Sequence, residues 1–178
     1  MKLIPAITLY DPWASWVADR KKTIETRTHN RFRRLLGQVV AIHAGLHWDS
    51  LAYEMASRYR PLDELMVREP AAGVIVALAK VCGFRLLRAS DSPAALCDCG
   101  SITRYGLFLS NVNKLATPQP ATGHQGIWFW QPKSENYVRD ADHPCGQFEA
   151  GTGPGYCEGD SHYMCRECAN FQPDEGEE

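Results

Sequence analysis

The sequence predicts an α+β protein, a small β-barrel with a few flanking helices, because three features occur together. Several apolar segments have the length and spacing of β-strands, whereas few have the 3.6-residue spacing of a helix. Glycines lie where a long strand would have to bend. With 178 residues, 44% of them apolar, the chain is long enough for one ordinary domain and a small appendage.

The predicted elements follow one another closely. Residues 3–9 alternate like a strand, residues 12–21 form a short helix with Asp11 as its N-cap and Trp13 and Trp16 on its apolar face, and residues 23–27 return to the two-residue period of a strand. Further elements are expected along the rest of the domain: strands at 38–44, 72–87 (with a bend at Gly83), 105–115 and 127–131, helical segments at 47–59 and 61–68, and an insertion loop at 89–103.

The most informative stretch is the strand that follows the first helix. Its two-residue period places Thr23, Glu25 and Arg27 on one face, next to Lys22. An acid and a base two residues apart beside two tryptophans can form a ligand site. The alternative is a surface Glu–Arg pair beside a core helix, and the spacing alone leaves both open.

This stretch resembles the ASCH family, the PUA-like domains named after the activating signal cointegrator. Members open with a strand, a Pro-Trp-Ala helix and a Lys-x-x-Glu-x-Arg strand, which match residues 7–15 and 22–27 here. Two further blocks match in order, Gly-Gln-Val-Val-Ala-Ile-His-Ala at 37–44 and Gly-His-Gln-Gly-Ile-Trp at 123–128. The resemblance implies a PUA-like barrel over residues 1–131 that binds nucleic acid in a cleft beside the barrel.

Charge is distributed unevenly along the chain. The net charge is −2, which excludes a protein held on DNA or RNA by overall positive charge. Residues 20–34 nevertheless contain seven Lys or Arg against the single acid Glu25, whereas residues 174–178 are acidic apart from one glycine. We therefore expect a local basic patch beside the Glu25 face, the alternative being a solvated basic loop.

The expected partner is RNA, or another nucleic acid or nucleotide, with DNA and modified nucleosides left open. Lys22 and Arg27 would neutralise phosphate, and Glu25 would accept a hydrogen bond from an exocyclic amine. The predicted nucleic-acid-binding residues are Trp13, Ser15, Lys22, Thr23, Glu25, Arg27, Arg31, Arg33, Arg34, His43 and Ser110.

The alternative function is a hydrolase that uses the same cleft. The resemblance implies it, because some ASCH members are ribonucleases or amidohydrolases that remove an acyl group from cytidine. Lys22 and Glu25 would then act as catalytic acid and base, supported by His43 or Ser110. The amidohydrolase branch has a threonine nucleophile three residues after the lysine, and Glu25 occupies that position here.

Residues 132–178 form a separate segment that is rich in cysteine and poor in aliphatic residues. Cys145, Cys157, Cys165 and Cys168 are the predicted ligands of a structural zinc ion, since the last two have the Cys-x-x-Cys spacing of a tetrahedral site. His143 or His162 in place of one cysteine, or a metal-free tail, are the alternatives. The predicted result is an irregular, metal-stapled extension with an acidic end, and a protein partner for it is a further alternative.

The last expectations concern the three cysteines before residue 132 and the location of the protein in the cell. Cys82, Cys97 and Cys99 are predicted to be buried without a function, the alternative being that Cys97 and Cys99 join a second metal site with other ligands. The chain has no apolar run near the ~20 residues of a membrane span and no signal peptide at its start. A cytoplasmic protein without a membrane partner is expected.

Overall fold

The computed structural model describes residues 3–133. The four cysteines predicted to bind zinc, and the whole predicted extension after residue 133, lie outside the described residues. The zinc site and the domain boundary at residue 131 therefore stay predictions.

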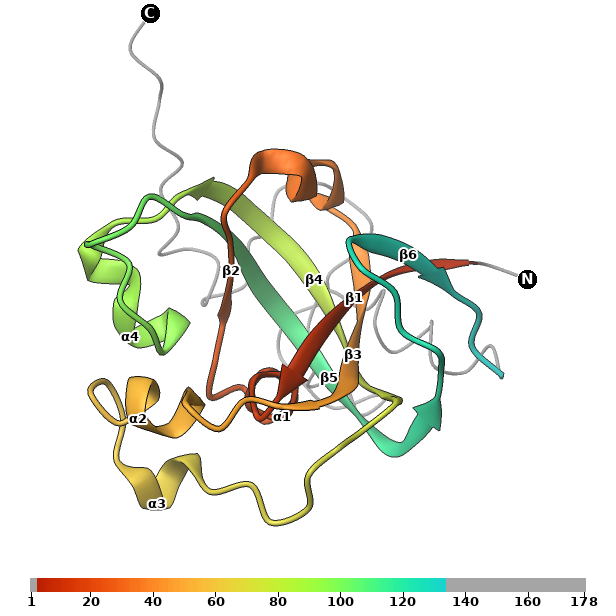
Figure 1. Cartoon of the computed structure of the whole chain (residues 1–178). Helices are drawn as coiled ribbons and strands as arrows, with labels where there is room; N and C mark the ends of the chain where they lie inside the picture. Colours follow the sequence, from red (N-terminus) through yellow and green to blue (C-terminus); the bar gives the residue numbers. More distant parts are fainter. Residues whose placement is uncertain (1–2, 134–178) are drawn as a thin grey trace, which may run out of the picture.

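The described part is built on a six-stranded mixed sheet with the order β2-β5-β4-β3-β1-β6 (Figure 1). Strands β1 and β3 run parallel, and the other neighbours are antiparallel. The strands are β1 Ile4–Asp11, β2 Ile24–Arg27, β3 Val39–Trp48, β4 Val74–Leu86, β5 Tyr105–Pro120 and β6 Ile127–Trp130.

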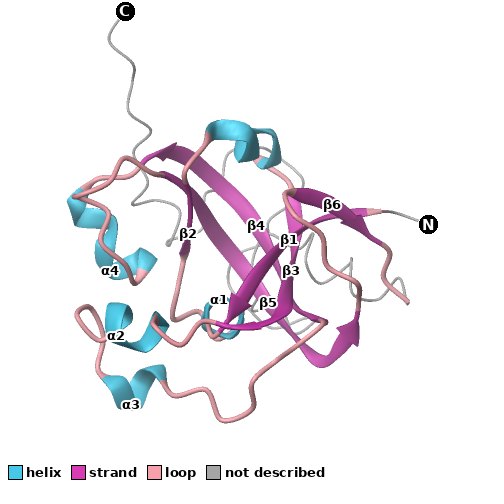
Figure 2. Cartoon of the chain, in the orientation of Figure 1, coloured by secondary structure: helices cyan, strands magenta, loops and turns pink. Residues whose placement is uncertain are grey.

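Short helices connect the strands, and in the view of Figure 2 most of them lie to the left of the sheet and below it, with one at the top. Several span little more than one turn, so packing rather than helix propensity holds them in place. They are α1 Trp13–Ala18, the 3-10 helix Asn30–Leu35, α2 Ala52–Ala56, α3 Leu62–Leu65, the 3-10 turn Ala89–Asp91 and α4 Ser92–Ala95. The predicted α+β class is confirmed.

The core follows from the apolar content of the central strands. Ile7, Ile42 and Ala77 of three neighbouring strands are fully buried, and the helix α1 adds Val17 to the same cluster. Gly83 lies at a register shift between β4 and β5, so the bend predicted from its glycine is found. These strands give the candidate site a rigid floor.

Two expectations need correction. The predicted helix over 47–59 is a helix only at Ala52–Ala56, because β3 continues to Trp48, which pairs with Asp11 of β1. The predicted loop over 89–103 contains a 3-10 turn and α4, which has Pro93 in its first turn.

The curved sheet is open. Strand β2 is hydrogen-bonded to β5 only and β6 to β1 only, so the ladder does not close within residues 3–133. Strand β2 is therefore an edge strand, and the gap beside it leaves room for a cavity. None of the helices in this described range is long and apolar enough to cross a membrane.

Candidate functional site

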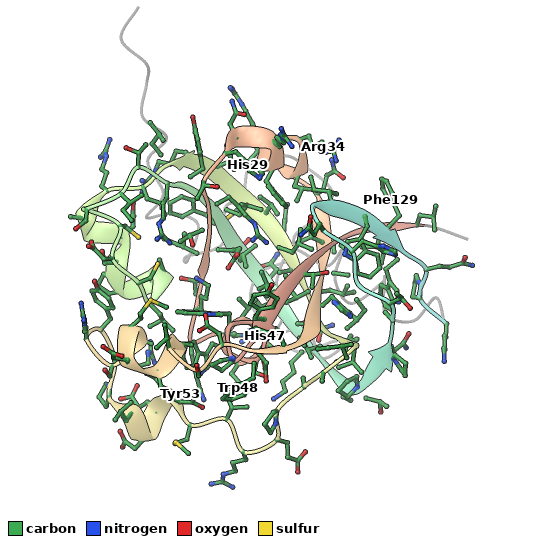
Figure 3. The ribbon with its side chains drawn as sticks, in the orientation of Figure 1. His29, Arg34, His47, Trp48, Tyr53 and Phe129 are labelled. Atoms are coloured by element: carbon green, nitrogen blue, oxygen red, sulfur yellow. The ribbon has the colours of Figure 1, made fainter. Side chains whose placement is uncertain are left out.

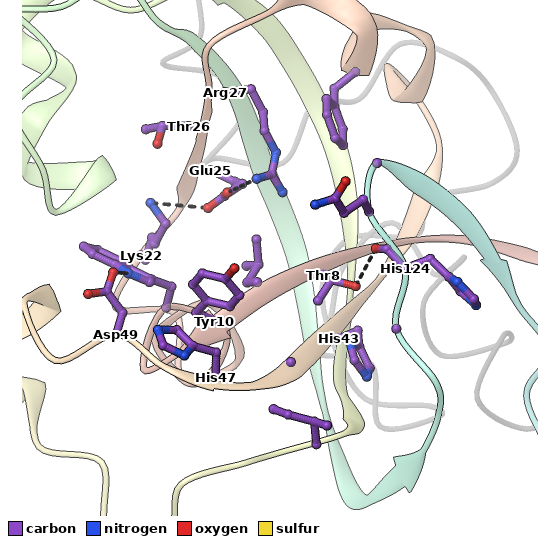
Figure 4. Close-up of a pocket in the computed structure, with 18 of the residues that line it drawn as sticks. Thr8, Tyr10, Lys22, Glu25, Thr26, Arg27, His43, His47, Asp49 and His124 are labelled. Carbon is purple, nitrogen blue, oxygen red and sulfur yellow. Dashed lines mark hydrogen bonds and ion pairs between the residues drawn. The ribbon is translucent and has the colours of Figure 1, made fainter.

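An open cavity of about 1350 Å³ lies in this gap, and we call it the seam cavity (Figure 4). Its walls come from β1, β2, the end of β3 and the loop 121–126 between β5 and β6. Segments that are far apart in the sequence therefore meet around one space. A cavity of this size can hold a ligand as large as a nucleotide.

Glu25 is the buried acid of the cavity, with 5% of its surface exposed. One carboxylate oxygen lies 3.5 Å from the Nζ of Lys22, and the other lies 3.2 Å from Nη1 of Arg27. The carboxylate thus stands between an ammonium and a guanidinium, as Figure 4 shows. The two-residue strand period predicted this arrangement of Glu25 and Arg27.

Lys22 is more deeply buried than the sequence suggests, at 1% exposure. Its Nζ donates hydrogen bonds to the carbonyl oxygens of Ile24 at 2.7 Å and Ala95 at 2.8 Å. The same Nζ lies 5.1 Å from the centre of the Trp13 ring. With Glu25 as a third neighbour, the ammonium is fully engaged, so Lys22 fixes Glu25 and ties β2 to α4.

Arg27 is oriented by an aromatic ring. Its guanidinium lies 4.7 Å from the centre of the Phe32 ring, and His29 stacks on the same ring at 5.4 Å. Phe32 belongs to the 3-10 helix Asn30–Leu35, and it is buried because its ring packs into the main core cluster. The local fold of residues 27–35 thus sets the direction of the guanidinium.

Aromatic side chains surround the other end of the cavity. The indole N–H of Trp13 donates to a carboxylate oxygen of Asp49 at 2.8 Å, and the second oxygen of Asp49 accepts from the backbone N–H of Leu51. Tyr10 meets His47 edge to face, with ring centres 4.7 Å apart. Tyr10 and His47 are both exposed, so their rings are available to stack on a base.

The loop 121–126 is fastened to the sheet at two points. The Nε2 of His43 lies 3.0 Å from the carbonyl oxygen of Ala121, and the Thr8 hydroxyl donates to the carbonyl oxygen of His124 at 3.0 Å. Burial lowers the pKa of His43, and it outweighs the opposing effect of the hydrogen bond to Ala121; the charge of His124 also lowers the pKa. His43 is therefore neutral at pH 7, with Nδ1 unpartnered among the described residues.

The structure brings together only part of the predicted set. Five predicted residues line the cavity: Trp13, Lys22, Glu25, Arg27 and His43. The other six do not: Ser15, Thr23, Arg31, Arg33, Arg34 and Ser110. The three arginines are exposed on the 3-10 helix next to the cavity, whereas Ser15 is buried under the helix start, where its N–H donates to Asp11.

Sequence reasoning missed several lining residues. Tyr10, Thr26, His29, His47, Asp49, Arg104 and His124 all face the cavity. Thr26 and His29 could have been predicted to line the cavity, because they lie within or close to the Lys-x-x-Glu-x-Arg block in the sequence. Arg104 could not have been predicted in this way, because only the pairing of β5 with β2 brings it to this site.

The three cysteines of the described part lie in the sheet and in a small apolar cluster beside it. Cys97 and Cys99 are buried in a small apolar cluster, as predicted, whereas Cys82 is only partly buried and donates to the carbonyl oxygen of Phe108. Burial raises the pKa of Cys99 to about 11, so its thiol is protonated and unreactive at neutral pH. Within residues 3–133, no group of three or more His, Cys, Asp or Glu is placed to hold a metal ion.

Comparisons with known proteins return ASCH structures at low identity. A crystal structure of ASCH from Zymomonas mobilis is similar with a TM-score of 0.48 and 12% identity, covering 76% of this chain and 90% of that one. Two mutant forms of the same protein have TM-scores of 0.47 and 0.46 at 11% identity, covering 78% and 76% of this chain and 96% and 92% of theirs. No protein-family model matches the sequence. No curated protein matches it either. The three structures carry the family name that the sequence blocks resemble, and the function of this chain has to be inferred from its own cavity.

Proposed function

We propose that the protein binds RNA or another nucleic acid by taking one nucleotide into the seam cavity. The observation that carries this proposal is the buried carboxylate of Glu25, held between Lys22 and Arg27 in an open cavity. A carboxylate oxygen in this position can accept a hydrogen bond from the exocyclic amine of a base. The resemblance to ASCH and PUA-like domains supports the same ligand.

The surroundings of the cavity fit the rest of such a ligand. Tyr10 and His47 offer exposed rings for stacking. Arg31, Arg33 and Arg34 are exposed on the adjacent 3-10 helix, where they can follow the phosphates of a strand that enters the cavity. Binding through a basic patch is compatible with a net charge of −2 because the patch is local.

Binding is tested with the full-length protein, labelled single-stranded RNA and DNA, and a Glu25→Gln variant. We expect Glu25→Gln to weaken binding about tenfold or more, since a hydrogen bond to a charged group contributes roughly 1.5–3 kcal/mol. Glu54→Gln is the matched control, because Glu54 is exposed on α2 and carries the same charge. Equal affinities for all three proteins in fluorescence anisotropy would contradict the proposal.

The hydrolase alternative is distinguished in the same samples. It requires Lys22 or Glu25 to exchange protons with a substrate, yet the Lys22 ammonium already has three acceptors within 3.5 Å. We expect labelled RNA and N4-acetylcytidine to remain unchanged over hours. Turnover that disappears in Glu25→Gln but persists in Glu54→Gln would replace binding with catalysis as the function.

A further inference from the structure

The seam cavity contains two guanidinium groups whose hydrogen-bonding capacity is not fully used. The Nε atoms of Arg27 and Arg104 are shielded from solvent, and neither has an acceptor among the described residues. Both side chains line the cavity. A shielded N–H without an acceptor costs free energy, so two of them in one cavity indicate that a ligand supplies the acceptors.

Arg104 also lacks a compensating acid. Within the described range, no carboxylate lies in ion-pair distance of Arg104, whereas Arg27 has Glu25. The pKa of Asp98 is lowered mainly by the hydroxyl of Ser101 and the N–H of Gly100, and only weakly by the charge of Arg104. Asp98 is exposed and accepts hydrogen bonds from these donors, and it forms no ion pair with Arg104.

The two arginines belong to the same end of the cavity. Arg27 pairs with Tyr105 in the ladder between β2 and β5, and Arg104 immediately precedes Tyr105. His29, which also lines the cavity, lies in the segment that follows β2. Figure 3 shows His29 in the upper part of the molecule and His47 below it, and the close-up in Figure 4 shows Arg27 above the rings of Tyr10 and His47. We call these two parts the cationic end and the aromatic end of the cavity.

The charge balance of the cavity is positive. Its described lining includes three cations, Lys22, Arg27 and Arg104, and two acids, Glu25 and Asp49. Asp49 is occupied by neutral donors, namely the indole of Trp13 and the backbone of Leu51. An anion at the Arg27–Arg104 end therefore meets an attractive field, even though the whole chain is slightly acidic.

We infer that Arg27 and Arg104 form a phosphate subsite at the cationic end of the seam cavity. The Nε–H and the adjacent Nη–H of an arginine form a fork that matches two oxygens of a phosphate, and a phosphate has enough oxygens for two such forks. The inference rests on the proposed function, because it supplies a phosphate contact for the nucleotide that the seam cavity takes in.

The subsite is tested by calorimetric titration of the full-length protein with the common ribonucleosides and their 5′-monophosphates at one ionic strength. We expect each monophosphate that binds to bind about tenfold or more tightly than its nucleoside, and Arg104→Gln to remove most of this gain. The affinity for the nucleoside should change less than twofold in Arg104→Gln. Arg58→Gln is the matched control, because Arg58 is exposed and does not line the cavity.

Two results would overturn the subsite. One is equal affinity of the wild-type protein for nucleoside and monophosphate, and the other is an Arg104→Gln variant that loses affinity for both ligands alike. If Arg104→Gln does not fold, Arg104→Lys is measured instead. Lysine retains the positive charge but lacks the paired N–H donors of the guanidinium. This variant should therefore retain only part of the difference in affinity between monophosphate and nucleoside. If neither nucleosides nor nucleotides nor oligonucleotides bind, the proposed function itself fails.

The phosphate can come from a terminal monoester or from the backbone of a strand. A dinucleotide with a free 5′-hydroxyl and one internal phosphodiester separates these sources. A gain over the nucleoside for the dinucleotide assigns the subsite to backbone phosphate. A gain for the monophosphate alone assigns it to a terminal phosphate, and either gain has to depend on Arg104.

Discussion

His43 shows how one buried side chain couples the site to pH. Its ring is 2% exposed, and its Nε2 contacts the carbonyl oxygen of Ala121. Because burial lowers its pKa below the ordinary 6.5, the folded protein binds a proton at His43 less readily than the unfolded chain. The stabilisation from neutral His43 is present above pH 6.5 and is lost as the pH falls through the folded-state pKa.

We therefore expect the free energy of unfolding to decrease as the pH is lowered from 7 through the range below 6.5, and the decrease to be smaller in His43→Gln. Urea denaturation at a series of pH values measures the dependence, and an NMR titration of the His43 ring gives its midpoint in the folded protein. A midpoint at or above 6.5 would contradict the stated direction.

The sequence predicted which residues lie in the site better than it predicted how deeply they are buried and what they contact. The Lys-x-x-Glu-x-Arg spacing was enough to place Glu25 near Arg27, because a strand puts alternate residues on one face. Lys22 lies just before the strand, so its contact with Glu25 does not follow from this period. The spacing could not predict that Lys22 is buried, since its acceptor Ala95 belongs to α4, more than seventy residues later in the chain. Such a contact depends on tertiary packing alone.

The loop 121–126 is the element on which the shape of the cavity depends most. A side chain at Gly123 would bring a Cβ within 2.3 Å of His43 Cε1 and 2.5 Å of His43 Nδ1. The absence of a side chain therefore allows the loop to lie directly against His43. The family-like block around Gly123 has a physical reason here, namely this close approach.

Gly123→Ala is expected to displace the loop and to lower the free energy of unfolding by roughly 1–3 kcal/mol, the usual cost of an overpacked contact. Because the loop is a wall of the cavity, ligand affinity should fall as well. Thr122→Ala is the control, since Thr122 is exposed in the same loop. Thermal and urea denaturation of both variants would reveal an error if Gly123→Ala were as stable as Thr122→Ala.

Whole elements were predicted well where their pattern was local. The strands β1, β2, β4 and β6 were found within about two residues of the expected positions, and the helix α1 was found but ends at Ala18, before the expected end at residue 21. The helix expected over 47–59 was found only at Ala52–Ala56, because pairing with β1 holds Trp48 in β3. Tertiary pairing overrode the helical spacing at this point.

For the molecule as a whole, the α+β class could be predicted, but the strand order could not. The parallel pairing of β1 with β3 brings Ile7 beside Ile42, and no local pattern specifies this neighbour. The seam cavity is a product of that order, because it leaves β2 at an edge. Its position thus followed from the family resemblance rather than from composition or spacing.

The segment after residue 133 carries a separate prediction, a structural zinc ion bound by Cys145, Cys157, Cys165 and Cys168. We expect about one zinc per chain by elemental analysis of reduced full-length protein. Replacing Cys165 and Cys168 by serine should remove the metal, whereas Cys82→Ser should retain it because Cys82 donates to a carbonyl oxygen in the sheet. Metal-free wild-type protein that was never exposed to chelator would contradict the site.

The open edge of β2 has a consequence for solubility. An edge strand with free backbone groups is a template on which another chain can add a strand. Here the strand is four residues long, and the ammonium of Lys22 occupies the carbonyl oxygen of Ile24. Lys22, which positions Glu25, thus also occupies a backbone acceptor of the edge strand β2. The sheet can therefore stay open beside β2 without exposing this acceptor to a strand of another chain.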